Sequence, residues 1–134
     1  MLKFVGDGVL AVFPAGSDGR ERACMQAVRA VVNAFAHPAA ASMRFVAALH
    51  VGPVVYGNIG SPDRLDFTVV GPTVNYLSRL EGVAKSLDRR AVCSKEIASA
   101  LSDEAAVSLG NQKLKGFAEP QEVFELRLPD RASD

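Results

Sequence analysis

The chain has 134 residues, of which 49% are hydrophobic and 22% charged, values that are ordinary for one globular domain. Fifteen basic residues balance fifteen acidic ones. This balance argues against a general nucleic-acid binder, which would need a basic excess. No apolar run approaches a membrane span. Two cysteines, Cys24 and Cys93, lack metal-ligand neighbours, so we interpret them as buried free thiols in a reducing, cytoplasmic compartment.

The chain opens with a predicted β-hairpin. Two β-rich runs, Leu2 to Val5 and Val9 to Phe13, flank an Asp-Gly turn, which is typical of a hairpin. On the residues alone, Asp7 is explained by turn chemistry, because aspartate tolerates the tight backbone there. Since the chain begins inside a predicted strand, we expect it to be a piece of a longer protein.

A helix is predicted over Gly16 to Ala36, capped by Ser17 or Asp18. Its hydrophobic spacing gives one buried stripe: Cys24, Ala27, Val28, Val31 and Phe35. His37-Pro38 and the alanines after it end this helix.

A second pair of strands, Arg44 to Val51 and Val54 to Ile59, is predicted around Gly52-Pro53. His50 lies in the first of these strands, and no serine, cysteine or carboxylate motif points to it. We therefore expect a structural histidine whose hydrogen bonds are satisfied.

A strand and a helix follow. Phe67 to Val70 is β-branched and aromatic, which favours a strand, and Pro72 is tolerated in the first turn of a helix that runs to about Leu87. One face should pack on a sheet: Val74, Leu77, Leu80, Ala84 and Leu87. Asn75 and Arg79 are stacked on another face, above Gly82 and Ser86. Such a pair can bind a ribose oxygen and a polyphosphate, although a lone pair more often marks a solvated face.

The last elements complete one domain. A short strand over Ala91 to Cys93 precedes a brief helix that Ser94 caps and that runs to Leu101. A hairpin then joins Ala106 to Lys115 with Gln121 to Leu128, and residues 129–134 are expected to be a frayed tail. Strands with two main helices between them predict an α+β sandwich, with the helices against an antiparallel sheet.

The chain resembles the catalytic domain of class III nucleotide cyclases, the adenylate and guanylate cyclases. Two segments carry the resemblance: Lys3-Phe-Val-Gly-Asp7-Gly and Arg64-x-Asp66-Phe-Thr-Val-Val-Gly-x-x-Val-Asn75-x-x-x-Arg79-Leu-Glu81. Each is weak alone, but their order and spacing are specific, and the resemblance extends from Lys3 to about Leu126. It implies a ferredoxin-like core and a head-to-tail homodimer with catalytic sites at the interface.

The resemblance implies adenylate cyclase activity, which makes cyclic AMP and pyrophosphate from ATP. Lys3 and Thr68 would read adenine, because lysine donates to a ring nitrogen and threonine accepts from the amino group. Many adenylate cyclases carry aspartate at the threonine position, and Asp66 lies two residues away on the same strand face. Lysine with threonine is similar to a Thr-bearing bacterial subgroup, some members of which respond to bicarbonate, whereas guanylate cyclases typically carry glutamate in place of the lysine.

The resemblance also assigns the chemistry. Asn75 would orient the ribose, and Arg79 would stabilise charge on the α-phosphate in the transition state. Asp7 would bind one of two Mg²⁺ or Mn²⁺ ions. Many relatives use a lysine on the terminal phosphates where this chain has Phe117, so Lys113 and Lys115 are the substitutes considered for that contact.

The sequence departs from the family pattern at its start. The family supplies its first metal aspartate from a strand ahead of the hairpin, and residues 1–128 lack that strand. We therefore expect the 134-residue chain alone to be inactive, and a longer protein to carry an upstream regulatory domain. The alternative is an inactive cyclase-like module that binds a nucleotide or a partner. A diguanylate-cyclase-type domain is a weaker option, because its Gly-Gly-acidic-acidic-Phe hairpin is missing.

Overall fold

The computed structural model describes residues 2–5, 8–15, 19–38, 45–53, 55–58, 67–70 and 72–128. The elements, in chain order, are β1 (Leu2–Val5), β2 (Gly8–Ala11), α1 (Arg20–Ala36), β3 (Ala47–Leu49), β4 (Val55–Asn58), β5 (Phe67–Val70), α2 (Pro72–Ser86), β6 (Ala91–Ser94), α3 (Lys95–Ala98), β7 (Ala106–Gln112) and β8 (Gln121–Leu126). Among the residues in these ranges, no helix combines the length and the apolar character needed to cross a bilayer.

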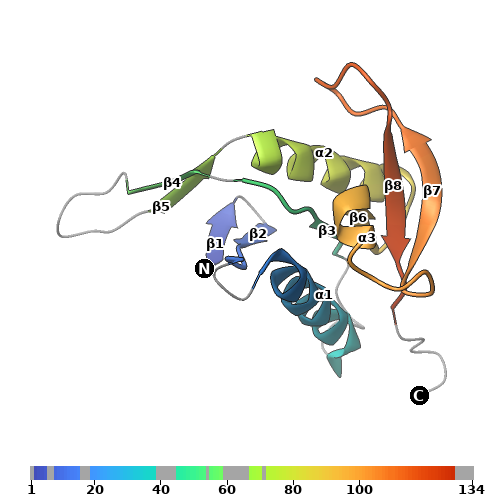
Figure 1. The fold of residues 1–134 in the computed structure, drawn as a ribbon, viewed down its shortest axis with the longest axis horizontal. Helices are drawn as coiled ribbons and strands as arrows, with labels where there is room; N and C mark the ends of the chain where they lie inside the picture. The colour runs from blue at the N-terminus through green and yellow to red at the C-terminus, as the bar shows by residue number, and fades with distance from the viewer. Residues whose placement is uncertain are drawn as a thin grey trace.

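The main sheet has four strands in the order β3-β6-β8-β7 (Figure 1). β3 and β6 are parallel, and the other two pairs are antiparallel. Cys93 of β6 belongs to the core cluster that includes α1, whereas its neighbour Val92 belongs to the cluster that includes α2. Since successive strand residues point to opposite faces, α1 covers one face of the sheet and α2 the other. The predicted α+β class, with helices packed on an antiparallel-rich sheet, is confirmed.

Two antiparallel hairpins accompany the main sheet. β1 pairs with β2, with Lys3 opposite Leu10, so the predicted N-terminal hairpin is confirmed, although its second strand ends at Ala11. β4 pairs with β5, with Thr68 opposite Gly57, so both of these predicted strands form, whereas residues 59–66 between them lie outside the described ranges.

The strand pair predicted around Gly52-Pro53 is wrong, because β3 pairs with β6 and β4 pairs with β5. The physical reason is a contact with the start of α2. Thr73 Oγ1 donates a hydrogen bond of 2.6 Å to the Pro53 carbonyl oxygen, and a Cβ at Gly52 would lie 2.5 Å from the same hydroxyl. The chain therefore leaves β3 along the first turn of α2, and it returns through that helix to the parallel strand β6.

Helix α1 keeps its predicted buried stripe but not its predicted cap. Cys24, Val28 and Phe35 are buried. The helix begins at Arg20, with Gly19 in the cap position and no side-chain cap bond, so capping by Ser17 or Asp18 is wrong. Those two residues lie outside the described ranges.

Both cysteines are buried free thiols, as predicted. Burial raises the pKa of Cys93 to about 12 and also raises the pKa of Cys24. Neither thiol is therefore primed as a nucleophile.

Helix α2 buries three residues: Tyr76, Leu80 and Ala84. Leu87 follows the last helical residue and is 37% exposed, so its predicted place on the packing face is wrong. Its amide still donates a helical hydrogen bond of 2.9 Å to the Val83 carbonyl oxygen, but its side chain lines the open groove beside α2 rather than the core. Tyr76, which the sequence did not single out, is only 8% exposed.

The predicted short strand, brief helix and last hairpin are confirmed with slightly different bounds, whereas the predicted tail falls on residues 129–134, which lie outside the described ranges. Ser94 Oγ accepts a hydrogen bond of 3.4 Å from the Ile97 amide and caps α3, which ends at Ala98 rather than Leu101. The last hairpin forms from β7 and β8, with a register shift beside Gly110, whose φ is +83°.

Substituting Leu80→Ala should lower the free energy of unfolding by about 2–5 kcal/mol, because the side chain is fully buried and truncation leaves a cavity. Leu87→Ala, which truncates an exposed leucine at the C-terminal end of the same helix, should change the free energy of unfolding by less than about 1 kcal/mol. Urea denaturation of both variants measures this difference. Equal losses would contradict the packing of α2.

Candidate functional site

The outer face of α2 presents Asn75 and Arg79, both of which are exposed. Their orientation follows from the inner face, because Tyr76 and Leu80 are buried in the cluster with β6 and β8. Among the described residues, the ion pairs are Lys85–Glu81 and Arg89–Glu125, so Arg79 is paired with no carboxylate there. Its guanidinium is available for an anion.

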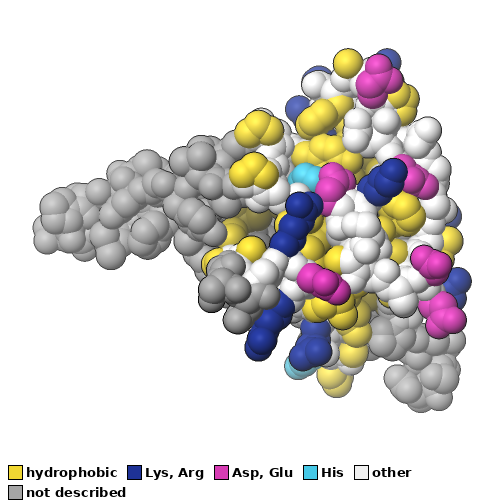
Figure 2. All heavy atoms as spheres, viewed as in Figure 1, with side chains coloured by type: hydrophobic (Ala, Val, Ile, Leu, Met, Phe, Trp, Pro, Cys, Tyr) yellow, Lys and Arg dark blue, Asp and Glu magenta, His cyan; other side chains and the backbone are white. Residues whose placement is uncertain are grey.

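An open groove of about 280 Å³ lies along this side of α2. Arg79 contributes from the helix above Gly82 and Ser86, and Lys113 and Lys115 contribute from the segment after β7. On the face viewed in Figure 2, basic and acidic side chains are interspersed. The charged residues that line the groove are all cations. Three cations around one groove suit a polyphosphate, and Val83, Leu87 and Leu114 supply the apolar part of its lining.

Lys113 and Lys115 reach the groove because of the residue between them. Leu114 is 2% exposed and packs in the same cluster as Leu80, so it fixes the segment against α2. Both lysines are exposed on either side of it. The structure thus brings Lys113 and Lys115 together with Arg79, which sequence spacing alone did not indicate. It does not bring Asn75 into the groove, because Asn75 lies one helical turn earlier and is not a lining residue.

The other predicted site residues are described only in part. Lys3 lies on β1 and Thr68 on β5, in two separate hairpins, and only their backbones are described. Asp7 and Asp66 lie outside the described residues. The roles of these four residues in reading the base and binding metal therefore stay predictions.

The part of the chain that the structure describes contains no cluster of three or more histidines, cysteines or acidic residues able to hold a metal ion. The described side chains thus do not fit a divalent metal by themselves. The metal assignment therefore depends on Asp7, which lies outside the described residues.

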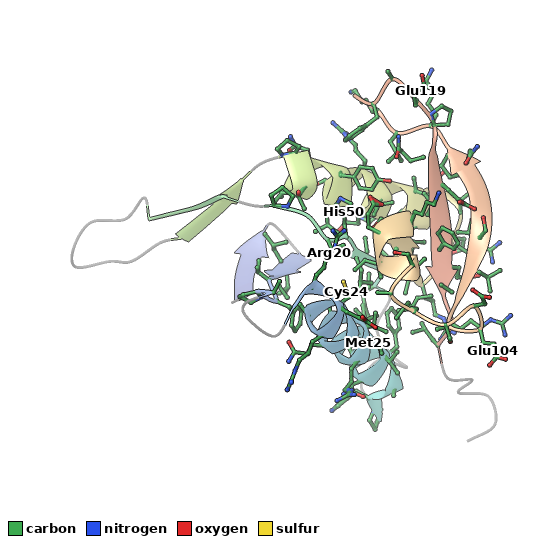
Figure 3. The ribbon with its side chains drawn as sticks, in the orientation of Figure 1. Arg20, Cys24, Met25, His50, Glu104 and Glu119 are labelled. Atoms are coloured by element: carbon green, nitrogen blue, oxygen red, sulfur yellow. The ribbon has the colours of Figure 1, made fainter. Side chains whose placement is uncertain are left out.

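An apolar cavity of about 300 Å³ lies on the other side of α2's first turns. It is lined by Leu10, Ala11, Val12, Phe13, Pro14, Ala15, Ala23, Cys24, Ala27, His50, Val51, Gly52, Thr73, Val74, Leu77 and Ile97. His50, Arg20 and Cys24 lie in this central region of the molecule (Figure 3). The lining carries few polar groups, so the cavity does not suit a phosphate.

His50 is a structural residue, but its predicted hydrogen bonding is wrong. Its ring stacks on Tyr76, with centroids 4.2 Å apart. Its Nδ1 is buried and has no hydrogen-bond partner among the described residues. Burial lowers the pKa of His50 below its ordinary 6.5, the Glu96 carboxylate opposes this shift, and Arg20 adds slightly to it. The fold therefore favours the neutral imidazole.

Tyr76 is the residue of this region that sequence reasoning missed. Besides His50, its ring meets Phe117 edge-on at 5.2 Å, and its hydroxyl donates a 3.5 Å hydrogen bond to Gln121 Oε1. The one signal in the sequence was its position beside Asn75 on the same helix. A large aromatic side chain next to a polar pair indicates that the helix has a second, buried face there.

No family model matches the chain. The uncharacterized protein MT1361 of Mycobacterium tuberculosis is 37% identical over 128 residues, which are 90% of this chain and 22% of that protein. Adenylate cyclase 1 of Rhizobium meliloti is 30% identical over 136 residues, which are 94% of this chain and 20% of that protein. The chain therefore spans about a fifth of the length of these curated relatives.

Solved cyclases share the fold. The adenylyl cyclase CyaB from P. aeruginosa matches with a TM-score of 0.66 and 26% identity over 97% of this chain and 72% of that chain. A bacterial light-regulated adenylyl cyclase matches with a TM-score of 0.68 and 20% identity, over 94% of this chain and 38% of that chain. The guanylyl cyclase Cya2 matches with a TM-score of 0.62 and 22% identity, over 98% of this chain and 71% of that chain. The chain has a cyclase-type fold, and since both adenylyl and guanylyl cyclases match, this fold does not separate ATP from GTP.

His50 should make stability depend on pH. The pKa of His50 in the folded chain lies below 6.5, its value in the unfolded chain. The contribution of the neutral imidazole to the free energy of unfolding is therefore fully present above pH 6.5. It is lost as the pH falls through the folded pKa, because the unfolded chain binds the proton first. His50→Phe keeps a ring against Tyr76 and removes the titration. We expect this variant to lose less unfolding free energy than the parent between about pH 7.5 and 5. Identical losses in urea titrations would overturn the assignment.

Proposed function

We propose that this chain is the catalytic domain of a class III nucleotide cyclase that converts ATP to 3′,5′-cyclic AMP and pyrophosphate. The observation that carries the proposal is the groove in which Arg79 meets Lys113 and Lys115. The cyclase-type fold and the relative named adenylate cyclase support it. The two free thiols favour a reducing, cytoplasmic setting.

In this proposal, the polyphosphate of ATP lies along the groove. Arg79 faces the α-phosphate, and Lys113 and Lys115 neutralise the terminal phosphates. Asn75 orients the ribose one turn away, since a helical turn spans about 5.4 Å. The 3′-oxygen forms a bond to the α-phosphorus while the bond to pyrophosphate breaks, and the hydroxyl proton leaves to solvent. Arg79 acts chiefly in the transition state, where charge on the α-phosphate grows.

The base and metal assignments rest on the family resemblance. We propose that Lys3 and Thr68, with Asp66 beside them in sequence, select adenine. Asp7 holds one of two Mg²⁺ or Mn²⁺ ions, which supply charge neutralisation when bound. In a head-to-tail homodimer, Lys3 and Asp7 of one protomer meet Asn75 and Arg79 of its partner. Comparing cyclic AMP with cyclic GMP production tests the base preference.

We also propose that the apolar cavity is the seat of the strand that the family places ahead of the N-terminal hairpin. Leu10 and Ala11 of β2 line the cavity on one side, and His50, Val51 and Gly52, which follow β3, line it on the other. Among the described residues, β2 pairs only with β1 and β3 only with β6, so each strand has an edge left to pair. The longer relatives support an upstream regulatory domain as well.

A nucleotide-binding module without activity is the second candidate. The absence of a carboxylate cluster from the described residues favours it. Turnover by the full-length protein separates the two, because only a cyclase releases cyclic nucleotide and pyrophosphate in equal amounts.

The 134-residue chain alone should not turn over ATP, because it contains one of the two metal aspartates that the family implies. The measurement is cyclic AMP production at high protein and manganese concentration, with the full-length protein as the positive control. Robust turnover by the short chain would refute this expectation.

Arg79→Ala in the full-length protein should lower kcat by about 100- to 1,000-fold, because it removes a donor that acts in the transition state. ATP binding should weaken far less. Lys85→Ala is the matched control, since Lys85 is an exposed cation of the same helix that pairs with Glu81 outside the groove. Equal losses in kcat and in ATP affinity would contradict the role of Arg79.

A further inference from the structure

Phe117 does not line the groove of Arg79, Lys113 and Lys115, but it packs on the helix that carries Arg79. Its half-buried ring meets Tyr76 edge-on, with centroids 5.2 Å apart and ring planes at 84°. Edge-to-face pairs of this kind are favourable beyond the area they bury. Phe117 thus joins the segment after β7 to α2.

The turn that contains Phe117 also carries the groove lysine Lys115. The Phe117 amide donates a hydrogen bond of 3.0 Å to the Leu114 carbonyl oxygen, which closes a four-residue turn. Gly116 has a φ of +90° at its third position, where a side chain would be strained. The turn therefore has two anchors, the buried Leu114 and the half-buried Phe117, with Lys115 between them.

Tyr76 receives this turn and lies three residues before Arg79 on the same helix. Its ring lies between His50 and Phe117. Its hydroxyl reaches Gln121 at the start of β8, at 3.5 Å. The helix that carries Arg79 and the turn that carries Lys115 are thus held through one aromatic side chain.

We propose that Phe117 is a positioning residue: by docking on Tyr76, it holds Lys113 and Lys115 across the groove from Arg79 for the terminal phosphates of a nucleoside triphosphate. The inference rests on the proposed function of the groove. Three cations around one groove repel each other, so the turn needs a contact that opposes its opening when no anion is bound. Docking the turn before binding reduces the ordering that the ligand has to drive.

Inorganic tripolyphosphate is the probe, because it presents the phosphates without base or ribose. Its binding to the full-length protein is measured by calorimetry. Phe117→Leu should weaken binding about three- to tenfold, whereas Phe117→Tyr, which keeps the ring, should stay within about twofold. Phe35→Leu is the matched control, because it removes a stacked aromatic pair with Phe45 in the other core cluster. It should leave tripolyphosphate binding unchanged.

The second measurement asks whether Phe117 acts through the lysines. In a protein that already carries Lys113→Ala and Lys115→Ala, adding Phe117→Leu should cause no further loss of tripolyphosphate binding. With ATP, Phe117→Leu should raise KM while kcat stays near that of the parent. Additive losses, or equal weakening by Phe35→Leu, would mean that Phe117 only stabilises the fold.

The outcomes separate this inference from the proposed function. If Phe117→Leu weakens tripolyphosphate binding but the full-length protein makes no cyclic nucleotide, the positioning role stands and the cyclase proposal fails. If cyclic AMP forms and Phe117→Leu binds like the parent, the positioning role fails alone. A parent protein that does not bind tripolyphosphate also overturns it.

Discussion

The packing of one helix face determines how the candidate site is arranged. Leu80 and Ala84 of α2 are fully buried, in a cluster with Val92 and Val123 of the sheet. Because alanine has almost no bulk, the helix can approach the sheet closely there. A helix fixed on its inner side has no rotational freedom left, so its outer residues are presented in one direction. The availability of Arg79 is therefore a consequence of apolar burial on the opposite face.

Tyr76 extends that constraint beyond the helix. It contacts His50 after β3, Phe117 in the last connection and Gln121 on β8, three segments that are distant in sequence. The stack with His50 has an electrostatic consequence, because it buries an imidazole nitrogen that has no partner in the described part of the chain. Such a ring is tolerated while neutral, and charging it opposes the packing.

Sequence patterns predicted the local elements well, because the signals for them are local. Pro72 marks the start of α2, Ser94 caps α3, and the two runs that flank the Asp-Gly pair form a hairpin. The misses concern partners chosen across the chain. Alternation in β3 does not say that β6 lies beside it, and helical spacing predicted that Leu87 is buried, whereas its side chain is exposed. The exposure of Asn75 and Arg79 on one helix followed from their spacing, whereas the approach of the lysines to Arg79 depends on the fold.

The net charge of the chain is zero, whereas the charged residues that line the groove are all cations. A net charge of zero says that no long-range field attracts polyanions, yet it permits a local cluster of cations. The cluster arises from the alternation Lys113-Leu114-Lys115, in which the leucine enters the core and both lysines remain at the surface. The same alternation couples the two properties, because the burial of Leu114 that stabilises the fold is also what holds the lysines beside α2. We therefore expect the affinity of this groove for an anion to depend on core packing as much as on charge.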